Sequence, residues 1–340
     1  MTNIADLDFV TGQYFPIASS TVAAKLNLSM LRSGDVAAVT NMTFPSFRSL
    51  LAPCLAGEAH NGCAVIALVA RDGDIPVGLV LAQVPMAAAT DERGAERQKT
   101  AELLSVFVVS AWRRCGVATR LMLALEEALI QRACIRLATC HTTRLASWQP
   151  FERLLSATRW PAPETTLLMT TGYYHEMAKA PWLATSYETR PGFELFEWSQ
   201  LSTGERAQLQ RDVDGGKIPD GLSPFGDDET IEPTISVGVR HNGEVVAWLI
   251  VIRSPFVPNA LCYRSLFVRS HLRTVQALGP LMMAAAFHRH ATSTIAEERP
   301  VLVFGISFKR STKMINFFRK RLASFCFSTY ETRVSMKTLT

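Results

Sequence analysis

One stretch of the chain, residues 103–125, joins an apolar strand, a short polar turn and an amphipathic helix. Gly116 precedes the helix, and because glycine has no Cβ, backbone N–H groups there can approach an anion closely. The N–H groups of a first helical turn have no partner within the helix, and the helix dipole favours negative charge at that end. Three arginines surround the same point: Arg113, Arg114 and Arg120. The segment therefore predicts a binding site for a diphosphate group.

The spacing Arg113-x-x-Gly116-x-Ala118 after a strand resembles the acyl-CoA signature of the GNAT acyltransferase superfamily. The strand before it and the helix after it are the context that this motif requires. The resemblance implies acetyl-CoA, or another acyl-CoA, as co-substrate, with the CoA pyrophosphate held on the loop. It assigns CoA binding to these residues: Val106, Phe107, Val108, Arg113, Arg114, Cys115, Gly116, Val117, Ala118, Thr119 and Arg120.

The composition is that of a globular chain rather than a disordered one. Of the 340 residues, 48% are apolar and 19% are charged, and this length can hold two domains. Seven cysteines occur without a CxxC pair or zinc-ligand spacing, which indicates a reducing compartment and no metal site. The net charge of +5 is spread along the chain, so it fits an anionic ligand and does not indicate nucleic-acid binding.

Targeting and membrane signals are weak. The first residues carry an aspartate and no basic region, so no signal peptide is predicted. The longest apolar stretch, residues 77–89, is interrupted by Gln83 and Pro85 and is too short to span a bilayer. We therefore expect a cytoplasmic protein without a membrane span.

The strand–loop–helix segment returns in a weaker form further along the chain. Val106–Ser110 reappears as Leu266–Ser270, and a hairpin dipeptide precedes each copy, Asp-Gly at 72–73 and Asn-Gly at 242–243. Repeats this far apart are duplicated domains, because the units of a solenoid are far shorter. The resemblance then implies an α/β (α+β) fold with two tandem GNAT-like domains, each a mixed, mostly antiparallel twisted sheet flanked by helices.

We expect an acyl-CoA-binding and catalytic GNAT domain over residues 1–180, with residues 165–176 as the strand that closes its sheet. A degenerate GNAT-like domain follows over residues 189–340, with the linker between the two. Its loop has Gln276 and Leu278 where the first copy has its small residues, and these side chains would block a pyrophosphate. The second domain is expected to pack, to form a homodimer or to shape the acceptor site; the oligomeric state is open.

The resemblance also implies a general base. In the histone acetyltransferase branch of GNAT, a catalytic Glu precedes the loop at a set spacing, and Glu102 stands at that spacing before Arg113. A partly buried carboxylate there could take a proton from the acceptor ammonium before it attacks the thioester. The second copy has Cys262 at this position. The alternative is that Glu102 is a solvated residue at the entrance of the strand.

A general acid is harder to assign. The Tyr that many GNAT enzymes place in a later helix corresponds to Phe151 here. Four side chains on neighbouring strands are the substitutes: Cys140, His141, Tyr173 and Tyr174. The CoA thiolate can also leave without a dedicated acid, so the assignment stays open.

The resemblance implies an N-acyltransferase that moves an acyl group, acetyl by expectation, from CoA to a primary amine of a small molecule by direct attack. Backbone N–H groups at Val106–Val108 would polarise the thioester carbonyl. Two alternatives stay open. The donor could be a long-chain acyl-CoA or an acyl carrier protein, or the chain could be a non-catalytic acyl-CoA-binding regulator or scaffold.

Overall fold

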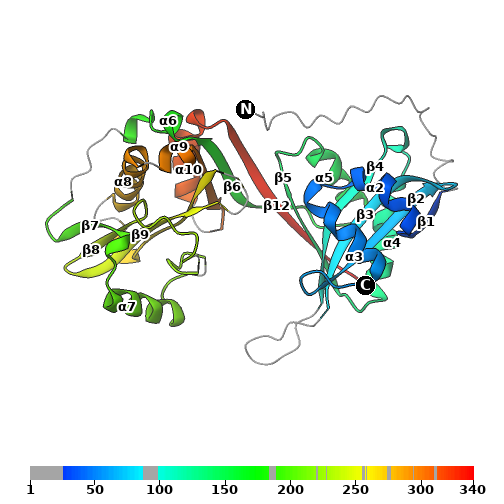
Figure 1. The fold of residues 1–340 in the computed structure, drawn as a ribbon, viewed down its shortest axis with the longest axis horizontal. Coiled ribbons are helices and arrows are strands. Elements are labelled where there is room, and N and C mark those ends of the chain that lie inside the picture. The colour runs from blue at the N-terminus through cyan, green and yellow to red at the C-terminus, as the bar shows by residue number, and fades with distance from the viewer. Residues whose placement is uncertain are drawn as a thin grey trace. The chain divides into compact units, whose positions relative to one another are not determined.

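The chain forms two compact units (Figure 1). The first unit runs to Glu164 and includes Arg333–Thr340, and the second is Thr165–Thr332. This computed structural model describes the following residues: 26–86, 99–183, 189–219, 221–226, 228–254, 257, 259–273, 277–293, 295–309 and 312–340. Within the described residues, no helix is both long enough and apolar enough to cross a membrane.

The first unit is built on a sheet that helices cover on both faces. Its strands neighbour one another in the order β1 (Asn27–Met30), β2 (Cys63–Asp72), β3 (Ile75–Pro85), β4 (Thr100–Val108), β5 (Arg136–Thr142) and the end of β12 (Ser328–Thr338). Its helices are α2 (Val36–Val39), α3 (Leu51–Ala56), α4 (Val117–Ile130) and α5 (Trp148–Ala157), with 3-10 turns at Ser33–Asp35, Thr40–Met42, Pro45–Leu50 and Ser110–Trp112. Strands β1 to β4 pair antiparallel, and β4 pairs parallel with β5.

Two apolar clusters hold these layers together. Helices α2 and α3 pack on one face of the sheet, and α4 and α5 pack on the other (Figure 1). On α4, Leu121, Leu125 and Leu129 are fully buried, because their spacing places them on one side of the helix. Strands β2 and β3 are apolar almost throughout, as expected of strands with both faces covered.

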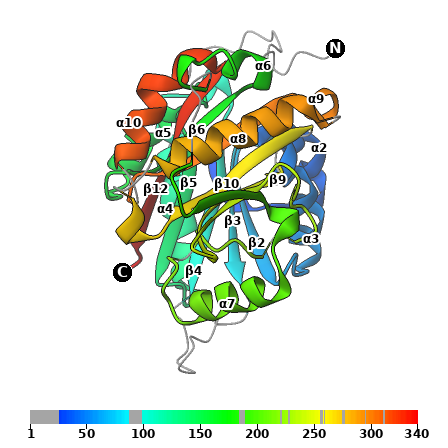
Figure 2. The same ribbon diagram turned by 90° about the vertical axis from the view of Figure 1, so that its left-hand side faces the viewer.

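The second unit repeats this plan. Its strands follow the order β7 (Phe193–Glu197), β8 (Val237–His241), β9 (Glu244–Arg253), β10 (Ala260–Val268), β11 (Val301–Ser307), β6 (Glu164–Tyr173) and the beginning of β12. Its helices are α6 (Tyr174–Met177), α7 (Thr203–Asp214), α8 (Leu278–Thr292), α9 (Ile295–Glu298) and α10 (Thr312–Arg321), with 3-10 turns at Pro181–Leu183, Trp198–Gln200, Ser270–Leu272 and Ala323–Phe325. Helix α8 runs alongside β9 and β10, and its apolar side chains join their cluster (Figure 2).

Strands β4 and β10 show the repeat in three dimensions. Each has a bulge, at Leu104 in β4 and at Arg264 in β10, and each pairs parallel with its neighbour only along its first residues. The arginine after each strand also makes the same contact. Arg113 Nε donates to Val108 O at 3.0 Å, and Arg273 Nε donates to Val268 O at 3.0 Å. The two tandem copies of one fold expected from the sequence are therefore present.

The strand that closes each sheet comes from the other half of the sequence. The prediction that residues 165–176 close the first sheet was wrong, because β6 pairs antiparallel with β11 of the second unit. The end of β12 takes the place beside β5, where the Leu339 N–H donates to Ile135 O at 2.9 Å. The division into units consequently falls at 164/165 and 332/333, not within residues 178–188. Local periodicity specifies a strand, but it does not specify the partner of that strand.

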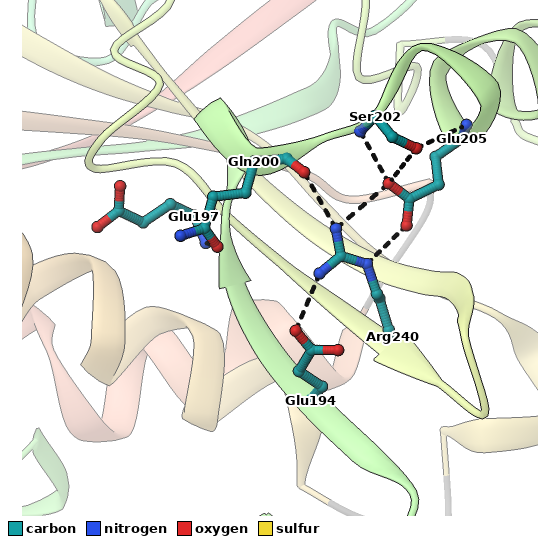
Figure 3. Close-up of polar contacts among 6 residues, drawn as sticks. All are labelled: Glu194, Glu197, Gln200, Ser202, Glu205 and Arg240. Atoms are coloured by element: carbon teal, nitrogen blue, oxygen red, sulfur yellow. Dashed lines mark hydrogen bonds and ion pairs between the residues drawn. The ribbon is translucent and has the colours of Figure 1, made fainter.

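A polar cluster around Arg240 fixes α7 in the second unit (Figure 3). The guanidinium donates to Glu205 at 2.6 Å, to Glu194 at 3.0 Å and to the carbonyl oxygen of Gln200 at 3.1 Å. Ser202 caps α7, and Glu205 accepts from its backbone N–H at 2.8 Å. Arg240 above all lowers the pKa of Glu205, to about 2. The start of α7 is thus held by a carboxylate that stays charged.

Candidate active site

A cavity of about 220 Å³ opens in the first unit where β4 and β5 part. Their parallel register runs from Thr100 and Arg136 only to Leu103 and Thr139, although both strands continue. Beyond this point β4 is no longer in register with β5. The cavity is lined by Phe44, Leu103, Leu104, Ser105, Val106, Phe107, Val108, Ala118, Thr139, Cys140, His141, Leu145, Ser147, Trp148, Pro150, Phe151 and Leu154.

The bulge at Leu104 shapes one wall of this cavity. An extra residue bends a strand and redirects the side chains that follow it. Here Ser105 turns to the face covered by α2 and α3, and its hydroxyl lies 2.8 Å from that of Thr43 in a buried contact. Phe44, which follows Thr43 in the chain, lines the cavity and is 42% exposed. The wall is therefore apolar, with one hydroxyl pair behind it.

The predicted phosphate loop lies at the start of α4. Gly116 is the N-cap residue and has φ +84°, a left-handed conformation that glycine adopts without strain. A Cβ built on Gly116 would meet nothing within 4 Å, so the space beside the helix start is open. The first-turn N–H groups of α4 face that space without side-chain capping at Gly116. Arg114, two residues earlier, is exposed and also has a positive φ of 67°.

The other predicted loop residues hold the loop in place. The guanidinium of Arg113 donates to Val108 O and lies over the Phe107 ring at 5.8 Å. Arg120 donates to Leu26 O at 3.1 Å. The remaining four are at least partly buried: Cys115 and Val117, which belong to the core, and Ala118 and Thr119. The structure thus brings the eleven predicted CoA residues together along the end of β4, the loop and the first turn of α4.

Glu102 lies on β4 before the bulge. Its side chain is exposed and accepts a hydrogen bond from Gln83 Nε2 at 2.9 Å. Glu102 does not line the cavity. It does interact electrostatically with Cys140, which is one of the lining residues. Burial raises the pKa of the Cys140 thiol, and the Glu102 carboxylate raises it further. Cys140 is therefore a neutral thiol, and Glu102 lies within electrostatic reach of the cavity.

One polar cluster at the cavity was not predicted as a unit. His141 at the end of β5 contacts Glu152 of α5, and Glu152 in turn pairs with Arg333 of β12. Sequence analysis named His141 as a substitute acid but could not find its partners, since 181 residues separate Glu152 from Arg333. The substitutes Tyr173 and Tyr174 belong to the second unit.

The equivalent positions in the second unit carry aromatic rings. Tyr263 and Phe304 face each other in the β10–β11 register, as Leu103 and Thr139 do in the first unit. Their ring centroids lie 4.6 Å apart, and Phe287 packs on Tyr263 at 5.4 Å. At the start of α8 the N-cap is Ala277, and a proline lies in its first turn. Gln276, which was expected to block the loop, lies outside the described residues.

Comparisons with known proteins agree with this geometry. Residues 38–155 match the model of the Acetyltransferase (GNAT) family. A tandem GNAT protein from the clavulanic acid biosynthesis pathway, solved without acetyl-CoA, has a TM-score of 0.50 at 13% identity, over 93% of this chain and 99% of its own. A GCN5-related glucosamine N-acetyltransferase region of a fungal multi-domain GH3 β-N-acetylglucosaminidase has a TM-score of 0.50 at 14% identity, over 92% of this chain and 38% of its own.

At these identities the structural likeness shows the fold alone. No curated protein matches the sequence. The family match lies in the half that carries the cavity and the loop, and the tandem fold extends over both halves. Residues 38–155 therefore carry a domain of the Acetyltransferase (GNAT) family, and the chain as a whole has the fold of a tandem GNAT protein.

Proposed function

We propose that the first unit is an N-acyltransferase that moves an acyl group, acetyl by preference, from acyl-CoA to a primary amine of a small molecule. The GNAT family domain over residues 38–155 supports acyl transfer in general. The observation that carries the assignment to this unit is the cavity between β4 and β5, which lies beside the open helix start at Gly116. An anionic head group and a narrow arm that ends in a thioester, joined as in acyl-CoA, fit these two features together.

In this proposal the first turn of α4 binds the CoA pyrophosphate through backbone N–H groups. Arg114 adds positive charge there, while Arg113 keeps the loop against the end of β4. The acyl-pantetheine arm enters the cavity, and backbone N–H groups at Val106–Val108 polarise the thioester carbonyl. Glu102 accepts the proton of the acceptor ammonium from outside the cavity. The amine nitrogen then attacks the carbonyl carbon directly.

The second unit has a different part in this proposal. Tyr263 and Phe304 hold the register positions of Leu103 and Thr139, which line the cavity of the first unit, and this supports the interpretation that the second copy no longer takes an acyl-CoA arm. Its proposed roles are structural, or to shape the acceptor site. It also carries the beginning of β12, whose end completes the sheet of the first unit.

Calorimetric titration with acetyl-CoA tests the binding site. The wild type should bind with one site per chain, and Gly116→Glu should weaken binding at least tenfold, about 1.4 kcal/mol, because a carboxylate would enter the anion site. Gly73→Glu is the matched control. Gly73 also has a positive φ, and a Cβ there also meets open space, but it lies in the β2–β3 turn. Unchanged binding in Gly116→Glu, or no binding in the wild type, would refute the site.

The exposed position of Glu102 favours one second candidate, a non-catalytic acyl-CoA-binding protein. Its hydrogen bond from Gln83 and its absence from the cavity lining are both consistent with a solvated surface residue. A panel of primary amines with acetyl-CoA, followed by release of the CoA thiol, separates the two functions. A turnover that Glu102→Gln slows supports the base, and acetyl-CoA binding without turnover of any amine supports the binding protein. The same panel with longer acyl-CoA donors tests the chain length.

A further inference from the structure

We propose that His141 is a catalytic residue that protonates the departing CoA thiolate, held in position by Glu152 and Arg333. This assignment rests on the proposed function. His141 is the last residue of β5 that lines the cavity, and its side chain is only 4% exposed. It was one of four substitutes from sequence, and the geometry of the cavity now separates it from the others.

Three side chains form a relay behind the cavity wall. His141 Nε2 lies 2.9 Å from Glu152 Oε1, and both oxygens of Glu152 accept from Arg333 Nη1, at 2.7 and 2.9 Å. A charge-assisted pair of this kind fixes the Glu152 carboxylate beside the imidazole. The ring is therefore held in one orientation, with Nε2 directed at the carboxylate.

The other ring nitrogen lacks a protein partner. His141 Nδ1 is buried and makes no hydrogen bond within the described residues. A buried polar atom without a partner is destabilising, so such atoms usually have a ligand, a water or a function. Phe151 packs on the ring edge-on, with centroids 5.1 Å apart, and has no polar atom to offer. In this proposal the CoA sulfur is the missing partner of Nδ1.

The other polar side chains of the cavity are less suited to this step. The Ser105 hydroxyl is paired with Thr43, and the Thr139 hydroxyl donates to Leu103 O. Burial raises the pKa of the Cys140 thiol, so it is a weak acid in this setting. Serine and tryptophan side chains, as at Ser147 and Trp148, do not release protons near neutral pH. Imidazole is the group that both gives and regains a proton in that range.

The step balances as follows. The amine nitrogen forms a bond to the thioester carbonyl carbon, and the carbon–sulfur bond breaks with its electron pair on sulfur. The proton moves from Nδ1 of the imidazolium to sulfur, and CoA leaves as a thiol. The neutral imidazole regains a proton from those that the amine nitrogen releases on forming the amide. No oxidant, reductant or metal takes part in this transfer.

Arg333 gives the C-terminal end of the chain a role in this site. It belongs to the part of β12 that lies in the first unit, and its guanidinium also lies 5.8 Å from the Trp148 ring at the cavity. The same strand offers a matched control. Lys337 pairs with Glu126 at 2.7 and 2.9 Å, is buried to a similar degree and does not line this cavity. Breaking the Arg333–Glu152 pair or the Lys337–Glu126 pair disturbs the same strand, but only the Arg333–Glu152 pair contacts His141.

The test uses free CoA as the probe, so it needs no acceptor. Thiolate absorbance of bound CoA, titrated with pH, reports the pKa of its thiol. In the wild type this pKa should lie roughly 1 unit or more below that of free CoA, because the proposed N–H donor on His141 stabilises the thiolate. His141→Gln should abolish the difference while CoA still binds through the α4 loop. Glu152→Gln should reduce it, and Lys337→Met should leave it unchanged.

Each outcome decides between the two proposals. If the His141→Gln variant binds CoA and its thiol titrates as in the wild type, His141 does not contact the sulfur and the assignment falls. Glu152→Gln gives the same decision if His141→Gln does not fold, since an unchanged thiol pKa there excludes the relay. Failure of the wild type to bind CoA overturns the proposed function itself, and this assignment with it.

Discussion

The Arg240 cluster makes a quantitative prediction about the second unit. The perturbation is Glu205→Gln, which removes the negative charge but keeps a side-chain oxygen to accept from the Ser202 N–H. The pKa of Glu205 falls from 4.5 to about 2, chiefly through the hydrogen bond from Arg240, and its side chain is only 18% exposed. Such a fall corresponds to about 3 kcal/mol of stability at neutral pH. This is an upper figure, because the variant keeps the cap.

The sign follows from the lowered pKa. Stability from a carboxylate with a lowered pKa is complete above pH 4.5 and is lost as the pH falls from 4.5 toward 2. Hydrogen exchange of the α7 amides, followed by mass spectrometry, reports local opening of this helix. The difference in opening free energy between wild type and Glu205→Gln should be about 3 kcal/mol at pH 7 and about 1 kcal/mol at pH 3.

Asp228→Asn is the control for this experiment. Asp228 pairs with Arg206 near α7, but both side chains are about half exposed, so the loss should stay below about 0.5 kcal/mol. The reasoning is refuted if Glu205→Gln costs no more than this control at pH 7. It is also refuted if the difference between wild type and Glu205→Gln does not shrink at pH 3.

Three further predictions concern two buried groups and the cavity. His290 is fully buried, and desolvation lowers its pKa from 6.5 to about 4, so the free energy of unfolding should fall by up to about 3 kcal/mol as the pH drops from 6.5 to 4. Urea titrations of His290→Phe should show a weaker dependence of this free energy on pH. Asp35→Asn leaves the buried Arg71 guanidinium without its carboxylate and should cost the first unit about 3–5 kcal/mol in the same assay, whereas an effect below 1 kcal/mol would show that the pair is solvated. Thr139→Phe copies the second unit, where Phe304 holds this register position, and should weaken acetyl-CoA binding at least tenfold by calorimetry; unchanged affinity would place the acyl arm elsewhere.

Much of the first unit could be predicted from local sequence. The pattern around Leu121, Leu125 and Leu129 has the period of a helix with one buried face, and that face is buried. Gly116 precedes this helix, and its positive φ is the reason for a glycine at that position. The duplicated strand–loop–helix predicted two copies of one fold, and both are present with the same bulge. Each of these features depends on residues close together in the chain.

Other features depend on residues far apart, and local patterns could not predict them. In the sequence, Glu152 looks like an ordinary surface residue of a helix, yet it accepts a hydrogen bond from Arg333, 181 residues further along the chain. Strands β6 and β12 have acceptable strand sequences for either sheet, so their exchange between the copies left no signal. The aromatic pair of the second copy likewise required the β10–β11 register to be known.

The sequence by itself determined the fold class, the duplication and the glycine-capped helix start, because periodicity, turn residues and glycine positions act over a few residues. Only the tertiary structure decided which strand closes each sheet and where β4 and β5 part to leave a cavity. It also decided that His141 has one nitrogen tied to a carboxylate and the other without a partner. Such relations arise from packing between distant segments, and no local pattern of residue types encodes them.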